Sequence, residues 1–308
     1  MAVNITTAYA GEVLEQLLVR ATTGNEVVAG GHIRVQPNVK KKFAIPRLKT
    51  GQMLQRRVEQ PVESDSKGDF TIDEKYLEPK DMMAFTTFNP RVFETIWKPF
   101  QPTGNLVFRE LPPNIQNQFL AELAKVVDFE LGDLIINCEL GTGARDFFDG
   151  ILKRITDDTS VLVSDMTPAP ITAANVIEVF ESVRLKIPKA VRPNPNLKYF
   201  TSVEDADHYD QALTAREFKG TNYTDRNPER YKGTRIVPLT AWPKDLVVAA
   251  ATSAGIDSNF WMGVDYSDDD EVVMIDKLTN AGEKYFFKML MKVDTNIVFG
   301  EDIVIYQG

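Results

Sequence analysis

Apolar residues recur every three or four positions between residues 114 and 140, which is the spacing of one face of an α-helix. Two prolines precede Asn114, which is a good N-cap, and Gly141 and Gly143 provide a C-terminal stop. The pattern predicts a helix of roughly 26 residues and about 40 Å with no sustained heptad, so we expect a spine against which other elements pack. Its apolar positions are Ile115, Phe119, Leu123, Val126, Val127, Leu131, Leu134, Ile135 and Cys138.

Other helices are predicted before this spine. An amphipathic helix is expected over residues 6–22, and docking on its own domain or on a neighbouring subunit are alternatives that the sequence leaves open. The aromatic segment from Met82 to Phe108 is expected to form core against the spine, with a short helix at 91–97.

The second half of the chain alternates helices and strands and then becomes β-rich. A strand-like VLV, a helix from about Thr172 to Leu185, the strand LKYFTS and a helix starting near Glu204 predict an α/β subdomain. Several strands follow, with a long hairpin around 279–282 beside the spine. A bulge is expected near 285–293, because the apolar residues there keep no strict alternation. The predicted fold class is α+β.

The clearest charge pattern lies between residues 34 and 81. The stretch 34–57 holds eight basic residues and no acidic one, whereas 59–81 holds eight acidic residues against three lysines. Two such runs predict an extended hairpin whose strands attract each other, or attract the opposite run on the next copy of the chain. Nucleic-acid binding is the alternative for the basic run, but Phe43 is its only aromatic residue, and sites for single strands use stacking aromatics.

Composition indicates a globular chain with a sizeable core, since its 308 residues are 43% hydrophobic and 26% charged. The net charge of −9 argues against a protein whose main task is to wrap nucleic acid. The single cysteine, Cys138, excludes an internal disulfide and is expected to be a small buried hydrophobe on the spine. No signal peptide and no membrane-spanning apolar run is recognised, so the cytoplasm is the expected compartment.

Motifs for catalysis or metal binding are nearly absent, and no catalytic, cofactor-binding or metal residue is assigned. The two histidines, His32 and His208, lie far apart in sequence, and Gly141 and Gly143 are too few glycines for a dinucleotide motif. One acidic run could bind a divalent cation, but it lacks the pattern of an EF-hand loop and is expected to be a solvated turn. It consists of Asp265, Asp268, Asp269, Asp270 and Glu271.

The turn after the spine carries a resemblance to a known family. A long helix, a glycine-containing turn and a short GIL segment follow one another, as in the major capsid proteins of tailed bacteriophages, which have the Johnson (HK-ninety-seven-like) fold. The residues are Gly141, Thr142, Gly143, Gly150, Ile151 and Leu152. The order of the other elements resembles this family along nearly the whole chain, with an arm and a charged hairpin before the spine and a β-rich end after it.

The resemblance implies four parts. They are an N-terminal arm at 1–33, an extended loop at 34–80, a peripheral domain at 81–150 and 268–298 with the spine helix at 114–140, and an axial domain at 151–267 and 299–308. The implied function is that of a structural protein, not an enzyme, which self-assembles into hexamers and pentamers of an icosahedral phage head around double-stranded DNA.

The resemblance also implies partners. These are further copies of the chain, a portal and a separate scaffolding protein, because no N-terminal extension is long enough to act as a scaffold. A decoration protein is an optional further partner. Packaged DNA would be enclosed without sequence-specific contact, no membrane or cofactor is involved, and the location is the virion, with the host cytoplasm during assembly.

Two rival functions fit the sequence. The first is an encapsulin, the same fold used as a cellular compartment, which would bind cargo peptides in a pocket. The second is a soluble α+β enzyme that uses side chains of the polar region 204–231, with Asp207 and His208 as candidates. Co-purified cargo would favour the first, and a substrate-dependent activity in a monomer would favour the second.

Overall fold

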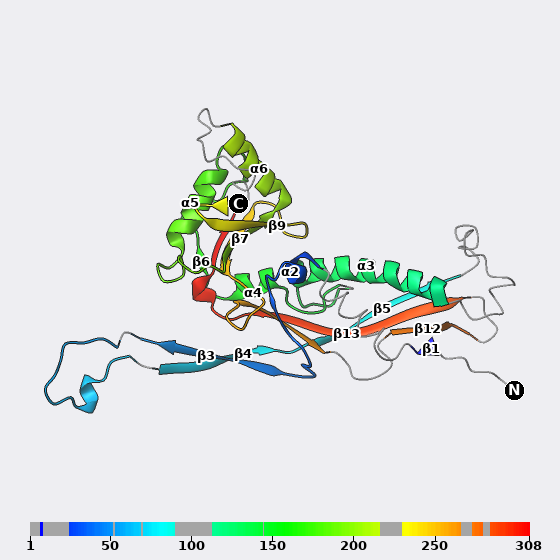
Figure 1. The fold of residues 1–308 in the computed structure, drawn as a ribbon, viewed down its shortest axis with the longest axis horizontal. Helices are drawn as coiled ribbons and strands as arrows, with labels where there is room; N and C mark the ends of the chain where they lie inside the picture. The colour runs from blue at the N-terminus through cyan, green and yellow to red at the C-terminus, as the bar shows by residue number, and fades with distance from the viewer. Residues whose placement is uncertain are drawn as a thin grey trace.

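The structure is a computed structural model, and it describes residues 7–8, 25–51, 53–68, 70–89, 113–143, 145–215, 230–265, 273–279 and 284–308. The described strands form three sheets, which together with the helices confirm the α+β class. The molecule is elongated: a two-stranded hairpin projects at one end, a long helix runs beside a long strand at the other, and an α/β unit rises between them (Figure 1). Among the helices described, none is both long and apolar enough to cross a membrane.

The predicted spine helix is confirmed as α3 (Pro113–Asn137). It ends at Asn137 rather than at residue 140, because the chain after it pairs with the start of α4 (Ile151–Asp157). The Cys138 carbonyl accepts a hydrogen bond from the Gly150 N–H at 2.7 Å. Cys138 itself is buried, as expected.

Gly150 is the point of close approach between α3 and α4. A Cβ atom at this position would lie 2.8 Å from the Ile136 carbonyl oxygen and 2.9 Å from the Cys138 nitrogen. Only glycine fits without displacing backbone. The next residue, Ile151, is buried in the core, so the GIL segment fixes the end of the spine to α4.

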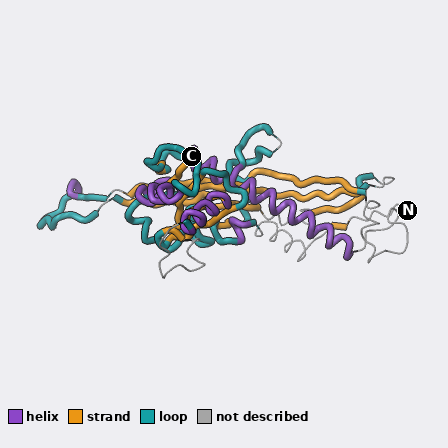
Figure 2. Tube along the Cα trace, turned by 90° about the horizontal axis from the view of Figure 1, so that it is seen from above, coloured by secondary structure: helices purple, strands orange, loops and turns teal. Residues whose placement is uncertain are grey.

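The first sheet is built around one long strand, β13 (Tyr285–Ile297). Its other strands are β1 (Thr7–Ala8), β2 (Arg34–Gln36), β5 (Lys80–Phe88), β11 (Phe260–Asp265) and β12 (Val273–Lys277). One edge of β13 pairs with β5 and the other with β12 and then β11, while β1 lies beside β12 and β2 beside β11. The antiparallel pair of β12 and β13 confirms the predicted long hairpin, and α3 runs along this sheet (Figures 1 and 2).

Two boundaries of the sequence-based division differ from this pairing. Residues 260–265 were assigned to the axial part and residues 34–36 to the extended loop. As β11 and β2, these residues instead extend the sheet of β13. Parallel pairing between strands so far apart in the chain has no local sequence signal.

The bulge expected in β13 is wrong. From Tyr285 to Val293 the strand pairs with β5 in unbroken register. Side chains do alternate, since Phe287 faces the core while Phe286 and Leu290 are at least partly exposed. The alternation was hidden in the sequence because the outward-facing side chains are apolar too.

The aromatic segment after residue 80 is core only in part. Met82 is buried, but Met83 and Phe85 are exposed, so the expectation for these two is wrong. The reason is that strand β5 directs alternate side chains to opposite faces. The predicted helix at 91–97 lies outside the described residues, as do residues 9–22 of the first helix, which was predicted over 6–22. Near its expected start, Thr7–Ala8 forms strand β1 instead of helix.

The second sheet confirms the predicted helices and strands of residues 151–251. Its strands, in spatial order, are β6 (Leu162–Val163), β14 (Val304–Gln307), β10 (Leu246–Ala251), β7 (Leu197–Ser202), β9 (Thr234–Leu239) and β8 (Arg230–Tyr231). Helices α5 (Val176–Lys186) and α6 (Val203–Thr214) pack on one face. The sheet therefore has a helix-covered face and a second face toward the spine.

Strand β10 lies between two hydrophobic cores, and all six of its residues are buried. Val247 belongs to the cluster that includes Phe180 of α5. Val248, on the other face, belongs to the cluster that includes Ile135 of the spine and Ile151 of α4. The unbroken apolar run of β10 is explained by burial on both faces, and the spine and the second sheet share one core.

We predict that Gly150→Ala lowers the free energy of unfolding by about 1–3 kcal/mol, because the added Cβ atom meets backbone that cannot move away. Chemical denaturation monitored by circular dichroism measures this. Glu139→Ala, an exposed change in the same connection, should stay within about 0.5 kcal/mol of the parent. Equal stabilities of the two variants would contradict the role given to Gly150.

Candidate assembly surface

The predicted charged hairpin is confirmed. Strands β3 (Phe43–Thr50) and β4 (Phe70–Leu77) pair antiparallel over their whole length, and we call residues 43–77 the hairpin arm. The arm projects from the rest of the molecule (Figure 1). Its distal loop contains a 3-10 turn at Glu63–Asp65.

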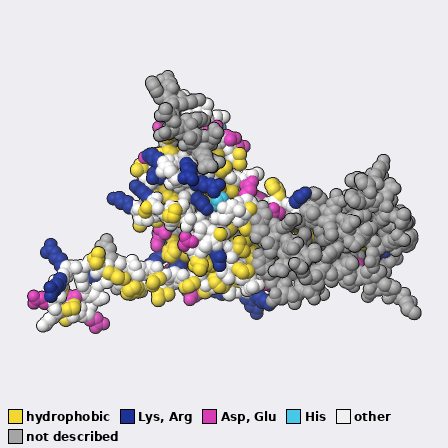
Figure 3. All heavy atoms as spheres, in the orientation of Figure 1, with side chains coloured by type: hydrophobic (Ala, Val, Ile, Leu, Met, Phe, Trp, Pro, Cys, Tyr) yellow, Lys and Arg dark blue, Asp and Glu magenta, His cyan; other side chains and the backbone are white. Residues whose placement is uncertain are grey.

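One face of the arm is apolar and faces solvent. Leu48 and Ile72 lie directly opposite each other, and Phe70 is two residues before Ile72 on the same face. Their exposed fractions are 57%, 74% and 65%, and hydrophobic side chains follow the arm in Figure 3. We call these three residues the apolar strip. A contiguous exposed apolar patch of this kind marks a surface that another molecule covers.

The opposite face of the arm is charged, and its strands attract each other as predicted. Arg47 forms a bidentate pair with Asp73 on the other strand, with 2.8 Å from Nε to Oδ1. Just beyond the strand ends Phe43 and Leu77, Lys42 pairs with Glu78 at 3.2 Å. Arg47 also donates to the Val298 carbonyl at 2.5 Å, which ties the arm to the body.

Two lysines of the arm pair with the body instead of with the other strand. Lys49 Nζ lies 2.7 Å from the Glu301 carboxylate, and Lys75 Nζ lies 3.0 Å from that of Asp158. We call these two contacts the anchor pairs. The contact of Lys49 differs from the sequence expectation, in which the basic run pairs within the hairpin or with another copy. The anchor pairs fix the arm so that its charged face is turned to the body and the apolar strip is left free.

Asp158 is held ionised by its surroundings. Burial works to raise the pKa of this carboxyl, but hydrogen bonds from the Ser160 hydroxyl and N–H and from Lys75 outweigh burial and lower the pKa to about 2. The anchor pair between Lys75 and Asp158 is therefore present well below neutral pH.

The base of the arm is joined to β13. The Glu78 N–H donates to the Asp294 carboxylate at 2.7 Å, and the Asn296 amide donates to the Tyr76 carbonyl at 2.7 Å. Asp294 also pairs with Arg154 of α4 at 3.2 Å. Burial raises the pKa of the Asp294 carboxyl, while the Glu78 N–H and Arg154 act in the opposite direction.

A second exposed apolar surface lies on the first sheet. Met83 of β5 is directly opposite Leu290 of β13, and both are exposed. Phe85 stacks on Phe286 with ring centroids 6.0 Å apart. Exposed apolar side chains are therefore found both on the arm and on the first sheet in the described part of the chain.

Some of the residues considered for catalysis or metal binding are described by the structure, and their surroundings differ. Asp207 is exposed, and the neighbouring buried carboxylate is Asp205, which accepts from the Asp245 N–H. His32 is buried against Lys198, and burial together with the charge of Lys198 lowers its pKa to about 4. The described residues contain no group of three or more side chains able to hold a metal.

The acidic run is described only at its first residue. The Asp265 side chain is nearly buried, and its Oδ2 lies 3.7 Å from Lys292 Nζ. Asp265 also pairs with Lys292 as the last residue of β11, so it is part of the first sheet and not of a solvated turn. Asp268, Asp269, Asp270 and Glu271 lie outside the described residues.

The apolar strip was missed by sequence reasoning, although a signal was present. Phe70 and Ile72 are spaced by two, as residues on one face of a strand are. The two residues lie within the acidic run, whose charges dominate the sequence pattern there.

We predict that Asp158→Asn loosens the arm, because Lys75 loses its charged partner, at a cost of about 1–2 kcal/mol. Hydrogen exchange of peptides that cover 43–50 and 70–77 should become faster. Lys153→Gln removes an exposed pair with Asp157 on α4 and should leave exchange in the arm unchanged. Equal hydrogen-exchange rates of the arm peptides in the two variants would refute the role given to the anchor pair.

The same contact predicts a pH dependence. The folded pKa of Asp158 is about 2 against an ordinary value of 3.8, so its stabilisation is complete above the ordinary value and is lost as pH falls toward 2. The stability difference between the parent and Asp158→Asn should therefore be full at pH 5 and shrink at lower pH, in denaturation curves. A difference that grows on acidification would contradict this.

Comparison with known proteins gives a fold and no close relative. No family model and no curated protein matches the chain. Among solved structures, the satellite phage P4 procapsid matches over 99% of this chain and 93% of its own, with TM-score 0.65 and 12% identity. The capsid of an empty GTA particle matches over 89% and 93% (TM-score 0.57, 12% identity), and a virus-like particle from Pyrococcus furiosus over 95% and 96% (0.52, 10%). The resemblance seen in the sequence is confirmed at the level of fold: this chain has the α+β fold of phage major capsid proteins.

Proposed function

We propose that this chain is the major capsid protein of a tailed bacteriophage, which self-assembles into hexamers and pentamers of an icosahedral head around double-stranded DNA. The observation that carries the proposal is the whole-chain match to the P4 procapsid, which leaves almost no part of either chain unmatched. A partial match would fit a shared domain in an unrelated protein, whereas agreement from arm to axial sheet fits a shared architecture.

The hairpin arm is the proposed link between neighbouring subunits. Its apolar strip is held away from its own body by the anchor pairs, so a second copy is the available partner for it. Burying a large apolar side chain contributes about 1.5–3 kcal/mol. The apolar surface of β5 and β13 is a candidate to receive the strip, and contact between two different surfaces closes a ring when the rotation between copies is right.

We also propose a role for each part of the chain. The sheet of β13 with the spine would be the peripheral domain, the sheet of β10 the axial domain, and residues 1–33 an N-terminal arm. Within residues 1–33, the structure describes only Thr7–Ala8 and the segment from Asn25 onward. In this proposal the axial domains meet at the centre of each hexamer or pentamer.

The proposed partners follow from the shell. They are further copies of the chain, a scaffolding protein, a portal, optionally a decoration protein, and DNA that is enclosed without sequence-specific contact. The net charge of −9 supports a shell that encloses the DNA without binding it tightly, because neutralising the phosphates needs a basic surface. We place the protein in the virion, and in the host cytoplasm during assembly, without a catalytic role, a cofactor or a membrane.

A compartment shell of the encapsulin type is the second candidate. The match to the Pyrococcus furiosus virus-like particle covers 95% of this chain. Particles that hold a protein cargo and no DNA would favour this candidate over the phage head. A soluble enzyme is less well supported, because no solved structure reported above is an enzyme and the candidate Asp207 is an exposed side chain.

We predict that the double change Leu48→Glu with Ile72→Glu abolishes shell formation, because it places carboxylates on the apolar strip at a cost of about 3 kcal/mol or more per interface. Light scattering after size-exclusion chromatography, followed by electron microscopy, measures assembly of the full chain with any scaffolding partner present.

Thr71→Glu is the matched control, since Thr71 is exposed on the opposite face of β4. Circular dichroism of both variants should match the parent, because all three positions already face solvent. Normal shells from the double variant would exclude the strip as the link, and a parent chain that stays monomeric under every condition would refute the proposed function.

A further inference from the structure

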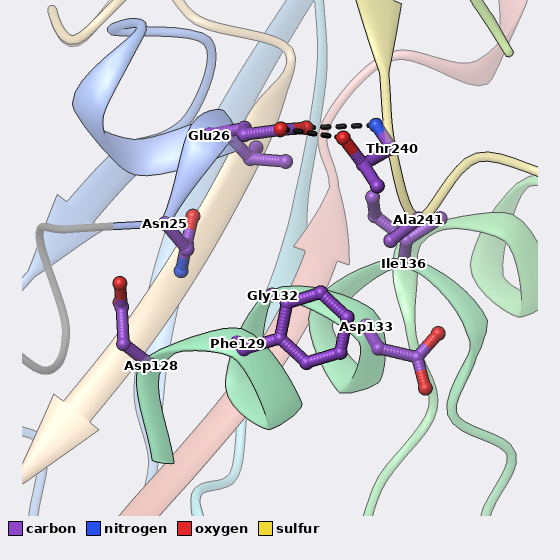
Figure 4. A pocket seen from close by; sticks show the side chains of 10 residues that line it. Asn25, Glu26, Asp128, Phe129, Gly132, Asp133, Ile136, Thr240 and Ala241 are labelled. Carbon is purple, nitrogen blue, oxygen red and sulfur yellow. Dashed lines mark hydrogen bonds between the residues drawn. The ribbon is translucent and has the colours of Figure 1, made fainter. Parts of the chain in front are cut away.

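A small cavity lies beside the spine, between α3, the short helix α2 (Glu26–Ala29) and the turn at 240–241. Its volume is about 160 Å³, on the order of the cavity of about 150 Å³ that admits a benzene-sized group. One side chain of a ligand would fill it. Figure 4 shows the residues that line it.

The walls of the cavity are fixed by specific contacts. Asn25 caps α2 by accepting from the Val28 N–H at 2.8 Å, and a Cβ atom on Gly132 of the spine would lie 3.2 Å from Asn25 Cβ. The Glu26 carboxylate accepts from the Thr240 N–H at 2.7 Å and its hydroxyl at 2.6 Å. The cavity is therefore built by three separate segments and does not depend on one flexible side chain.

Two polar atoms in the cavity wall have no partner among the described residues. Asn25 is only 5% exposed, and its amide nitrogen lacks an acceptor. Asp128 Oδ1, on the spine, is buried and lacks a donor. In Figure 4 the Asn25 amide is turned toward Asp128 across the opening. Buried polar atoms are normally hydrogen-bonded, so this wall offers an unused donor and an unused acceptor to a ligand that carries both kinds of group.

The other residues of the cavity wall determine which chemical class of ligand fits. Val27, Ile136 and Ala241 make it apolar, and the described lining residues include no lysine or arginine beside the Asp128 carboxylate. Phe129 stands at the rim and is 71% exposed. An apolar wall with one unpaired carboxylate and an exposed aromatic ring suits a cation on an aliphatic stem, through a charge-assisted hydrogen bond and a cation–π contact.

We propose that this cavity binds one basic side chain, of lysine or arginine, on a segment of a partner polypeptide. The aliphatic stem lies against Ile136 and Phe129, the cationic head donates to Asp128, and a backbone carbonyl of the same segment accepts from the Asn25 amide. The polypeptide is favoured over a free amine because it supplies both the donor and the acceptor that the cavity lacks. The site lies within one chain, so it does not depend on the proposed shell.

Methyl NMR of the full chain tests the proposal, with the Val27 and Ile136 methyl signals as reporters in whatever oligomeric form the chain adopts. The probe is Nα-acetyl-lysine N-methylamide. Its norleucine counterpart lacks the ammonium group, and butylammonium lacks the carbonyl. We expect saturable shifts from the lysine probe, weaker binding of butylammonium, and at least about tenfold weaker binding of the norleucine compound, as the loss of a charged hydrogen bond implies.

Two variants on the same helix make the test specific. Asp128→Asn should weaken binding of the lysine probe by about tenfold or more. Asp133→Asn is the matched control, because Asp133 also lines the cavity but already pairs with Asn137 and Arg145, and its effect should stay within about a factor of two. Equal binding of the lysine and norleucine probes, an unaffected Asp128→Asn variant, or a cavity that no probe shifts because it holds only water would each overturn the proposal.

Discussion

The parts of this molecule are held in place by a run of three buried polar side chains on one strand. Asp294, Thr295 and Asn296 lie consecutively on β13 and are almost fully buried. Together they bind the base of the arm, through Glu78, and helix α4, through Arg154. A buried carboxylate is costly unless it is paired and hydrogen-bonded, so these partners have little freedom to move. The direction in which the arm leaves the body is set at this point.

Away from that junction, the spine and the sheet of β10 are closely packed, whereas the hairpin arm is exposed. Strand β10 is buried on both faces, and the core on one of them also contains the end of the spine. The spine and the sheet of β10 therefore move as one body, because close-packed interiors deform little. Close approach at Gly150 completes this connection. What extends from the rigid body is a single pair of strands, which has no core of its own.

The arm is stable only because its two faces are used differently. A two-stranded hairpin is marginal in water, and here the charged face supplies the missing support through Arg47 and the anchor pairs. Its apolar strip remains exposed, which is unfavourable for a monomer and favourable for a subunit. The exposure of Leu48 and Ile72 agrees with the proposed shell, in which a second copy covers them.

The sequence by itself determined what depends on neighbours in the chain. Three features could be predicted in this way: the long helix of residues 114–137, the hairpin formed by the opposite charges of 34–81, and the helix that starts at the GIL segment. Helical periodicity, strand pairing across a loop and the glycine before a helix are all local properties of the chain. Only the tertiary structure decided what depends on distant partners. Lys49 meets Glu301 rather than the acidic run, β2 pairs with β11, Phe85 is exposed, and Asn25 meets the spine at Gly132 to form a cavity. Contacts between residues far apart in the chain leave no periodic mark on it, since the energy of such a contact depends on where the whole chain has already folded.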